Sequence, residues 1–324
     1  MRFRLRPSQH YLFFIVESLG EGKMKDKMEA GELMLMKGKL LTTLSSVGKE
    51  FFVAFELMVT KHTPGDWRSV IHLTTKGNYG AYGYRIPGVW LYKNHKLHIA
   101  SAVSGNHNYY YDHQDPLKEG EWYHIAIMQV MESNQVFPSK KYNNFITTFQ
   151  YIFTVIINGK QVHKVINSHP QSFDNVMVYA ADPWYPNVNG KLRNLQISER
   201  IQNDETLPLK KSNLLKTLPS IGMEYFVSFD LMITKHTTVP WRNVLHLTTH
   251  GNIGVYGYRT PGVWLDHTHK LHIASAVRGN QNYYLYHEDP MKEGKWCHIV
   301  IMQVMKNGQV TLYSSIKYFY TLFF

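Results

Sequence analysis

Aromatic side chains, an arginine and an asparagine recur as one group at two places in the sequence. Aromatic faces can stack on sugar rings, and Arg can hold a carboxylate or sulfate through two N–H groups. The alternative is that the rings are core residues and that Arg85 pairs with a carboxylate of its own module. The predicted ligand-binding residues are Tyr84, Arg85, Trp90, Asn106, Tyr109 and Tyr110, repeated as Tyr258, Arg259, Trp264, Asn280, Tyr283 and Tyr284.

The acidic side chains are not spaced for the hydrolysis of glycosidic bonds. That reaction needs an acid paired with a nucleophile or base. Glu56 and its counterpart Asp230 are isolated acids, and the other recurring acids flank a proline or glycine. We therefore predict no catalytic residues and do not expect an enzyme. A glycoside hydrolase of the same fold class is the main alternative.

A calcium ion at the rim of the fold is an alternative, because calcium takes carboxylate and carbonyl oxygens as ligands. Asp66 is replaced by Pro240 in the second copy and Asp112 by Tyr286, so neither acid recurs. Turn capping or solvated loops explain the acids that do recur, and we predict no metal ligands and no cofactor. These recurring acids are Asp115 with Glu119, and Asp289 with Glu293.

Histidine and cysteine give no stronger metal signal. Facing strands could bring three recurring histidines together, but their wide spacing favours ordinary strand-face residues. The single cysteine, Cys297, excludes an intramolecular disulfide and a multi-cysteine zinc site, and it stands where the first copy has Tyr123. We predict a packing role for this thiol. The histidines are His72, His98 and His124, matching His246, His272 and His298.

These residues recur because the chain contains one module twice. Trp67 aligns with Trp241 at an offset of 174 residues (241 − 67), which holds without a gap from 40–131 against 214–305. Roughly two-thirds of these positions are identical. Each copy is therefore a whole domain and not a short solenoid repeat.

Alternation of apolar and other residues predicts strands in both copies, as in Phe51, Val53, Phe55, Leu57 and Val59. Many short strands without a convincing amphipathic helix favour a sandwich or barrel. The Asn158-Gly159 pair predicts a hairpin. The fold class is all-β, with two tandem jelly-roll (concanavalin A-like) sandwiches. The further strand-like runs are 67–75, 96–103, 107–112, 122–131, 151–158, 161–166, 175–181 and 191–197.

We divide the chain into four parts, and expect the second module to be incomplete. No strand equivalent to 151–197 is expected after Val310, which would leave unpaired edges unless another segment or chain fills them. The parts are an N-terminal segment, 1–37, that is poorly ordered or a weak export signal, a first jelly-roll module at 38–198, a linker at 199–213, and a truncated second module at 214–324.

Composition limits the classes of partner. The net charge of +11 favours anionic partners, but neither a basic stripe nor a nucleic-acid reading motif is visible. No apolar run approaches the length of a membrane span. We therefore expect no nucleic acid and no membrane span, and the sequence does not define an oligomeric state.

Several segments resemble the laminin G-like, concanavalin A-like jelly-roll modules of cnidarian extracellular proteins, including the uncharacterised skeletal organic matrix proteins of corals. The resemblance covers about 38–198 fully and 212–310 partly. It implies a two-sheet sandwich, an extracellular or secreted setting, and a role in matrix or adhesion. The segments are Gly77-Asn78, 82–85, Pro87, 97–103, Gly105-Asn106, 157–160, 178–185 and 192–195.

Together the residues and the resemblance predict an extracellular binding or adhesion protein. Its expected partner is a matrix polysaccharide or an extracellular protein, recognised through the jelly-roll modules. A structural matrix component without a discrete ligand is the second alternative, after the glycoside hydrolase.

Overall fold

The structure is a computed structural model that describes residues 3–5, 12–15, 32–136, 146–201, 207–209, 212–215, 217, 224–306 and 309–318. Every regular element in these ranges is a β-strand, so the all-β prediction is confirmed. In this described part of the chain, no helix has the length and apolarity that a membrane span requires. The chain divides into two compact units, Ile15–Arg200 and Met1–Phe14 with Ile201–Phe324.

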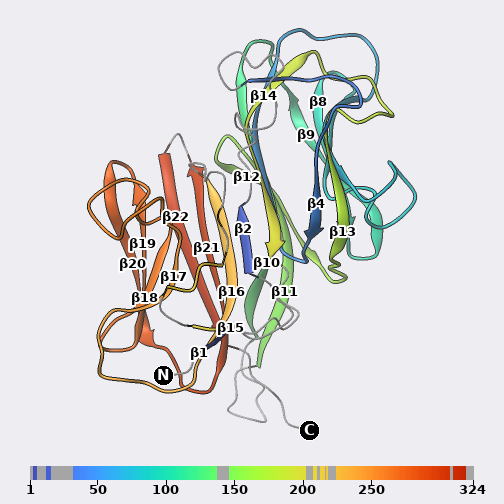
Figure 1. Cartoon of the computed structure of the whole chain (residues 1–324). Coiled ribbons are helices and arrows are strands. Elements are labelled where there is room, and N and C mark those ends of the chain that lie inside the picture. The colour runs from blue at the N-terminus through green and yellow to red at the C-terminus, as the bar shows by residue number, and fades with distance from the viewer. Residues whose placement is uncertain are drawn as a thin grey trace. The chain divides into compact units, whose positions relative to one another are not determined.

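The first module is a sandwich of two antiparallel sheets (Figure 1). Sheet I has the strand order β12-β11-β10-β5-β14, and β3 pairs with β14; sheet II has the order β4-β13-β6-β7-β8-β9. Sheet I consists of β3 (Leu33–Met34), β5 (Phe51–Val59), β10 (Trp122–Val136), β11 (Ile146–Ile157), β12 (Lys160–Asn167) and β14 (Gly190–Ile201). Sheet II consists of β4 (Leu40–Val47), β6 (Arg68–Thr74), β7 (Gly88–Tyr92), β8 (Lys96–Val103), β9 (Asn106–Pro116) and β13 (Phe173–Ala180).

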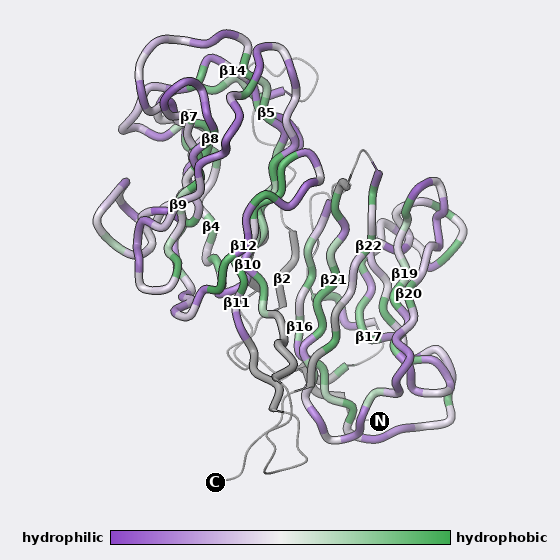
Figure 2. The backbone as a smooth tube through the Cα atoms, turned by 180° about the vertical axis from the view of Figure 1, so that it is seen from behind, coloured by the Kyte–Doolittle hydropathy of each residue, from purple (hydrophilic) through white to green (hydrophobic). Residues whose placement is uncertain are grey.

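The core of this module lies between the two sheets. Phe55 and Leu57 of β5 are fully buried in one hydrophobic cluster with Val89 of β7 and Ile99 of β8. Each such side chain contributes about 1.5–3 kcal/mol to folding by leaving water. Figure 2 shows the hydrophobic stretches along strands such as β5 and β10. The predicted strand runs agree with this sheet arrangement.

The predicted hairpin at Asn158-Gly159 is confirmed. Both residues have positive φ, 49° and 75°, as the tight turn between β11 and β12 requires. The Asn158 side chain also accepts a hydrogen bond from the backbone N–H of His124 at 2.9 Å, which fastens the turn to β10.

The second module repeats parts of both sheets. Sheet IV has the order β17-β18-β19-β20, and sheet III is centred on β16, which pairs with β21, β1 and β2. Sheet IV consists of β17 (Arg242–His246), β18 (Gly262–Leu265), β19 (Lys270–Val277) and β20 (Asn280–Pro290). Sheet III consists of β1 (Phe3–Leu5), β2 (Leu12–Ile15), β15 (Leu207–Pro208), β16 (Tyr225–Ile233), β21 (Trp296–Lys306) and β22 (Gln309–Tyr318).

The expectation that the second copy lacks every strand equivalent to 151–197 is wrong for one strand. Val310 of β22 lies opposite Met305 of β21, as Tyr151 of β11 lies opposite Met131 of β10. β22 is therefore the counterpart of β11, although only two residues separate it from β21 where nine separate β11 from β10. Within the described residues there is no counterpart of β12 or β13. The place of β14 is taken by β1 and β2, since Phe3 lies opposite Ile233 of β16 as Gly190 lies opposite Val59 of β5.

Candidate functional site

Strand alternation places aromatic side chains on the outer face of sheet II, the face turned away from the core. Along β7, Val89 and Leu91 belong to the core, so Trp90 and Tyr92 point to the opposite face. Gly88 leaves the necessary space, because a Cβ there would lie 2.0 Å from the Trp90 ring. The alternation along β7 therefore places two large aromatic rings on the outer face of sheet II.

The predicted ligand-binding Arg85 lies on this face, but it is only 5% exposed. Its guanidinium carbon stands 4.5 Å from the centroid of the Trp90 ring. Nε donates to the backbone carbonyl of Asn78 at 2.8 Å, and Nη1 donates to the side chain of Asn108. Burial lowers the pKa of the guanidinium. Arg85 therefore anchors the loop before β7, and the second module repeats this with Arg259, Trp264, Asn252 and Asn282.

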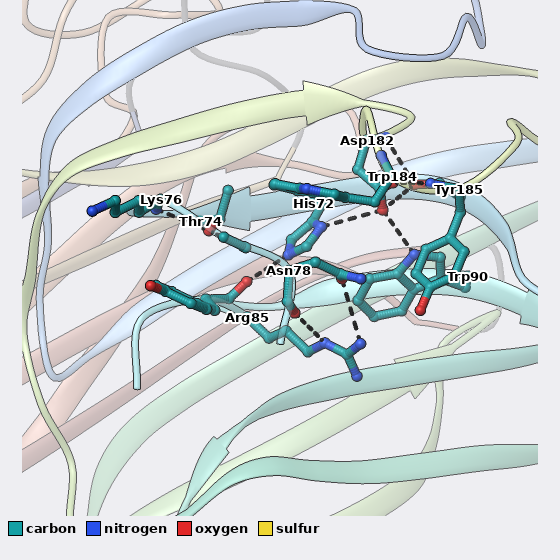
Figure 3. Close-up of polar contacts among 12 residues, drawn as sticks. His72, Thr74, Lys76, Asn78, Arg85, Trp90, Asp182, Trp184 and Tyr185 are labelled. Carbon is teal, nitrogen blue, oxygen red and sulfur yellow. Dashed lines mark hydrogen bonds and ion pairs between the residues drawn. The ribbon is translucent and has the colours of Figure 1, made fainter. Parts of the chain in front are cut away.

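Asp182, which follows β13, is a fully buried carboxylate on the same face (Figure 3). Ser69 Oγ donates to it at 2.9 Å and Trp90 Nε1 at 2.8 Å, and His72 Nδ1 lies 3.2 Å away. Backbone N–H groups of the next turn complete the set, from Trp184 at 3.0 Å and Tyr185 at 2.8 Å. One side chain thus joins β6, β7 and the segment after β13.

The hydrogen bonds at Asp182 determine its charge state. Burial raises the pKa of the carboxyl, but the bonds from His72, Tyr185 and Ser69 outweigh it, so the pKa lies below its ordinary value. The ring of His72 bridges two acceptors, since Nδ1 lies 3.2 Å from Asp182 and Nε2 lies 2.6 Å from the carbonyl oxygen of Tyr84. The cluster is satisfied internally and fully enclosed, which suits a structural joint and not a reacting group.

Beside this joint, three partly exposed rings surround His98; we call Trp67, Tyr92, Tyr110 and His98 the first platform. Trp67 stacks on Tyr92 at 4.1 Å between centroids, and Tyr110 stacks on His98 at 5.1 Å. His98 Nδ1 is held by Asp112 Oδ1 at 2.6 Å. Tyr110 is 53% exposed, so its ring is available to a ligand.

The second module carries a related second platform, formed by Trp241, Tyr284 and Tyr286 around His272. Trp241, Tyr284 and His272 have counterparts in the first platform, whereas Tyr286 takes the place of Asp112 and Asp266 that of Tyr92. The ring centroids of Trp241, Tyr284 and Tyr286 lie 5.1, 5.1 and 4.6 Å from that of His272. The three outer rings are 52%, 53% and 46% exposed, whereas His272 is 6% exposed. Burial, with a smaller effect of Arg259, lowers the pKa of His272 to about 4, so the histidine is neutral at pH 7.

Both platforms include a tryptophan with an unusual backbone. Trp67 has a φ of 60° and Trp241 a φ of 54°, a region that bulky side chains seldom adopt. In each copy the indole makes a T-shaped, edge-to-face contact with the buried histidine, His98 or His272. The same strained placement in two sequences that otherwise differ at a third of positions ties the tryptophan to the platform.

The structure separates the other predicted residues from the platforms. Tyr109 contacts His163 through its hydroxyl at 2.9 Å, and Asn106 accepts from the backbone N–H of Asn108 within a turn. The Tyr84 ring packs against Gly77. The structure thus unites Arg85 with Trp90, and links Tyr110 to them only through His98. Sequence reasoning did not assign Trp67, Tyr92 or Asp182 to the site, although alternation from Trp90 to Tyr92 was a usable signal.

The acids considered for hydrolysis are held by other groups of the fold. Arg193 pairs with Glu56 at 2.6 Å, and Asp230 is buried against His298 Nδ1 at 2.8 Å. Glu119 accepts a hydrogen bond from the backbone N–H of His62, which is a capping role. These contacts leave none of the three acids facing a second carboxylate.

The metal candidates and the cysteine have ordinary environments. His72 and His98 lie in sheet II and His124 in sheet I, and the described residues contain no group of three His, Cys, Asp or Glu suited to a metal ion. The prediction that Cys297 is a packing residue is confirmed, since it is fully buried and its thiol contacts the Leu231 carbonyl. Burial raises the pKa of this thiol.

Comparison with known proteins adds one structural similarity. No model of a known protein family matches the sequence, and no curated protein matches it. A native heptameric SAP-like pentraxin from Limulus polyphemus is similar in structure, with a TM-score of 0.31 and 13% sequence identity. The similarity covers 59% of this chain and 76% of that chain. The fold assignment rests on the strand pairings and not on this similarity.

Proposed function

We propose that this chain is a binding or adhesion protein that recognises extracellular polysaccharide or protein through its jelly-roll modules. The observation that carries the proposal is the pair of aromatic platforms, built at equivalent places in both modules. In the second platform three rings around one buried histidine are each about half exposed. Clusters of exposed apolar side chains on a folded surface mark binding sites more often than chance exposure.

The chemistry of the platforms suits a sugar. Aromatic rings offer flat apolar faces on which the C–H face of a pyranose can stack. Tyr284 and Tyr286 project from the same face of β20, so their hydroxyls can bond to the ring substituents of one saccharide. The net charge of +11 adds attraction to sulfated or carboxylated polymers.

We propose binding and not hydrolysis. Glycoside hydrolysis needs two carboxyl groups about 5–9.5 Å apart across the scissile bond. Asp112, the acid nearest to the first platform, instead holds His98, and Tyr286 replaces it in the second platform. A platform shared by both modules therefore has no shared acid, whereas it does have shared rings.

A glycan array tests this proposal with the full chain. We expect binding to a subset of polysaccharides, with heparin and chondroitin sulfate as acidic probes and laminarin and chitohexaose as neutral probes. Tyr110→Ala and Tyr284→Ala should each weaken binding, by roughly tenfold where one module dominates. Tyr313→Ala is the matched control, because Tyr313 is 37% exposed on β22, in sheet III rather than on a platform.

The same array distinguishes the alternatives. Reducing-end release from laminarin by the wild-type chain would show a hydrolase. Uniformly null binding at low salt would support a structural component without a discrete ligand. Arg85→Ala would not distinguish these alternatives, because removal of the buried guanidinium would disturb the loop that Asn78 and Asn108 hold.

A further inference from the structure

In the first module, β6 is covered along one edge by the segment 176–188. Residues 177–180 of β13 pair with β6 in antiparallel register, with Val178 opposite Leu73 and Tyr179 opposite His72. The contact continues past β13, where the Ser69 N–H donates to the Pro186 carbonyl at 2.8 Å and the Val188 N–H donates back to the Ser69 carbonyl at 3.0 Å. Asp182 then closes over this edge with its carboxylate.

In the second module, the equivalent strand β17 lacks such a partner among the described residues. It pairs with β18 on one side only, in the register that β6 has with β7. The exposure of the side chains differs accordingly. Leu73 is fully buried, whereas Leu247 at the same position is half-buried. Thr74 is buried, whereas Thr248 is exposed. An open edge with unpaired N–H and C=O groups is a template for another strand.

Two of the groups that hold Asp182 in the first module, His72 and Trp90, have counterparts in the second that keep their arrangement. His246 Nε2 lies 2.5 Å from the Tyr258 carbonyl, as His72 Nε2 lies 2.6 Å from that of Tyr84. The ring of His246 stands 5.3 Å from Trp264, against 5.0 Å in the first module. No described residue accepts from His246 Nδ1. Asn243 replaces Ser69, and its amide donates to the carbonyls of Leu245 and Val263, at 3.4 Å in each case.

We propose that the second module binds an extended polypeptide segment in trans, as an added strand along the free edge of β17. The segment carries an aspartate that takes the place of Asp182, followed by aromatic residues at the places of Trp184 and Tyr185. Backbone hydrogen bonds to β17 supply affinity, and the carboxylate between His246 and Trp264 fixes the register. Tyr284 and Tyr286 lie on β20 at the opposite edge of sheet IV, but Trp241 of the second platform directly precedes β17. Its counterpart Trp67 contacts Tyr185 at 6.0 Å between ring centroids, so the added segment would lie beside the second platform.

The donor we infer is a separate polypeptide and not a second copy of this chain. Residues 173–180 pair with β4 on one side and with β6 on the other, and Asp182 is fully buried. Transfer of this segment to a second copy would open one module to close another, with no net gain of strand pairs. A partner with a free segment of this chemistry has no such cost.

The probe is a fluorescent peptide of residues 173–187, titrated into the full chain and followed by anisotropy. We expect saturable binding with one peptide per chain. A matched peptide with Asp182→Asn should bind about tenfold or more weakly, because Asn presents N–H donors to the donors of His246 and Trp264.

Two variants at one exposed position locate the binding edge. In the first module the Ser69 N–H points to the added strand and not to β7, so Asn243→Pro removes one edge donor while leaving the pairing with β18. We expect Asn243→Pro to weaken peptide binding about tenfold, and Asn243→Ala to change it by less than about twofold. Analytical sedimentation of the chain alone should show no oligomer that dissociates when the peptide is added.

Three results would overturn the proposal. The first is absence of saturable binding by the wild-type chain. The second is peptide binding that Asn243→Pro leaves unchanged, which would place the peptide elsewhere. The third is an oligomer that the peptide dissociates, which would make a second copy the donor. Each leaves the sugar-binding proposal untouched, because the glycan array tests that proposal separately through Tyr110 of the first platform, in a module where β6 is already paired with β13.

Discussion

Replacing Asp182 by alanine is the sharpest test of how the first module is held together. The substitution removes one carboxylate and leaves the donors of Ser69, His72 and Trp90 buried without an acceptor. Removing a buried carboxylate that several buried donors share costs roughly 3–5 kcal/mol. For a module of this size, about 2–4 °C of melting temperature per kcal/mol gives a loss of roughly 6–20 °C.

Asp112→Ala is the matched control, since Asp112 also bonds to a histidine Nδ1, at 2.6 Å, but its side chain is 46% exposed. We expect it to cost less than about 1 kcal/mol. Scanning calorimetry of the full chain at pH 7 measures both variants. Equal effects, or a cost for Asp182→Ala below about 1 kcal/mol, would refute the assignment of Asp182 as the joint of β6, β7 and the closing segment.

The pH dependence of the Asp182 variant follows from its lowered pKa. A carboxylate with a depressed folded-state pKa contributes stability above its unfolded pKa of about 3.9, and loses that contribution as the pH falls through the folded value. The difference in stability between the wild type and Asp182→Ala should therefore be constant from about pH 7 to pH 5. It should shrink only below about pH 4.

Three further outcomes are expected. Gly88→Ala should destabilise the first module by about 2 kcal/mol or more in urea unfolding, because the new Cβ meets the Trp90 ring at 2.0 Å. Cys297 should react with a thiol reagent only in denaturant, because burial raises its pKa; fast labelling of the native chain would contradict this. His272 has a lowered pKa of about 4, so the stability it supports is present above about pH 6.5 and falls as the pH drops to 4; His272→Gln should flatten that dependence in equilibrium unfolding.

Most of the fold could be predicted from the sequence, because period-2 alternation and turn residues act locally. The runs at 96–103 and 161–166 and the Asn158-Gly159 turn correspond to β8, β12 and the hairpin between β11 and β12. The counterpart of β11 in the second copy was missed, because residues 132–150 interrupt the repeat and move β22 out of the constant offset. The strand pairing in the structure identifies β22 as the counterpart of β11, which the sequence spacing does not.

The site was less predictable because it depends on contacts between distant residues. In the sequence, Arg85 lies beside aromatic residues. Its guanidinium N–H groups nevertheless donate to Asn78 and Asn108, which only the folded loop brings within reach. Asp182 lies more than 90 residues from Trp90, and nothing local indicates their hydrogen bond. Burial, which decides whether a polar group binds a ligand or holds the fold, is a property of the packed sheets.

The most direct test of the proposed function is calorimetric titration of the full chain with heparin and chitohexaose. Wild type and the double variant Tyr110→Ala with Tyr284→Ala are compared, and Tyr313→Ala serves as the control. The platforms predict that the wild type and the control bind at least one of the two sugars with similar affinity, and that the double variant loses at least about tenfold. Undiminished binding by the double variant, or no binding by the wild type, would contradict the proposal that these rings form the ligand site.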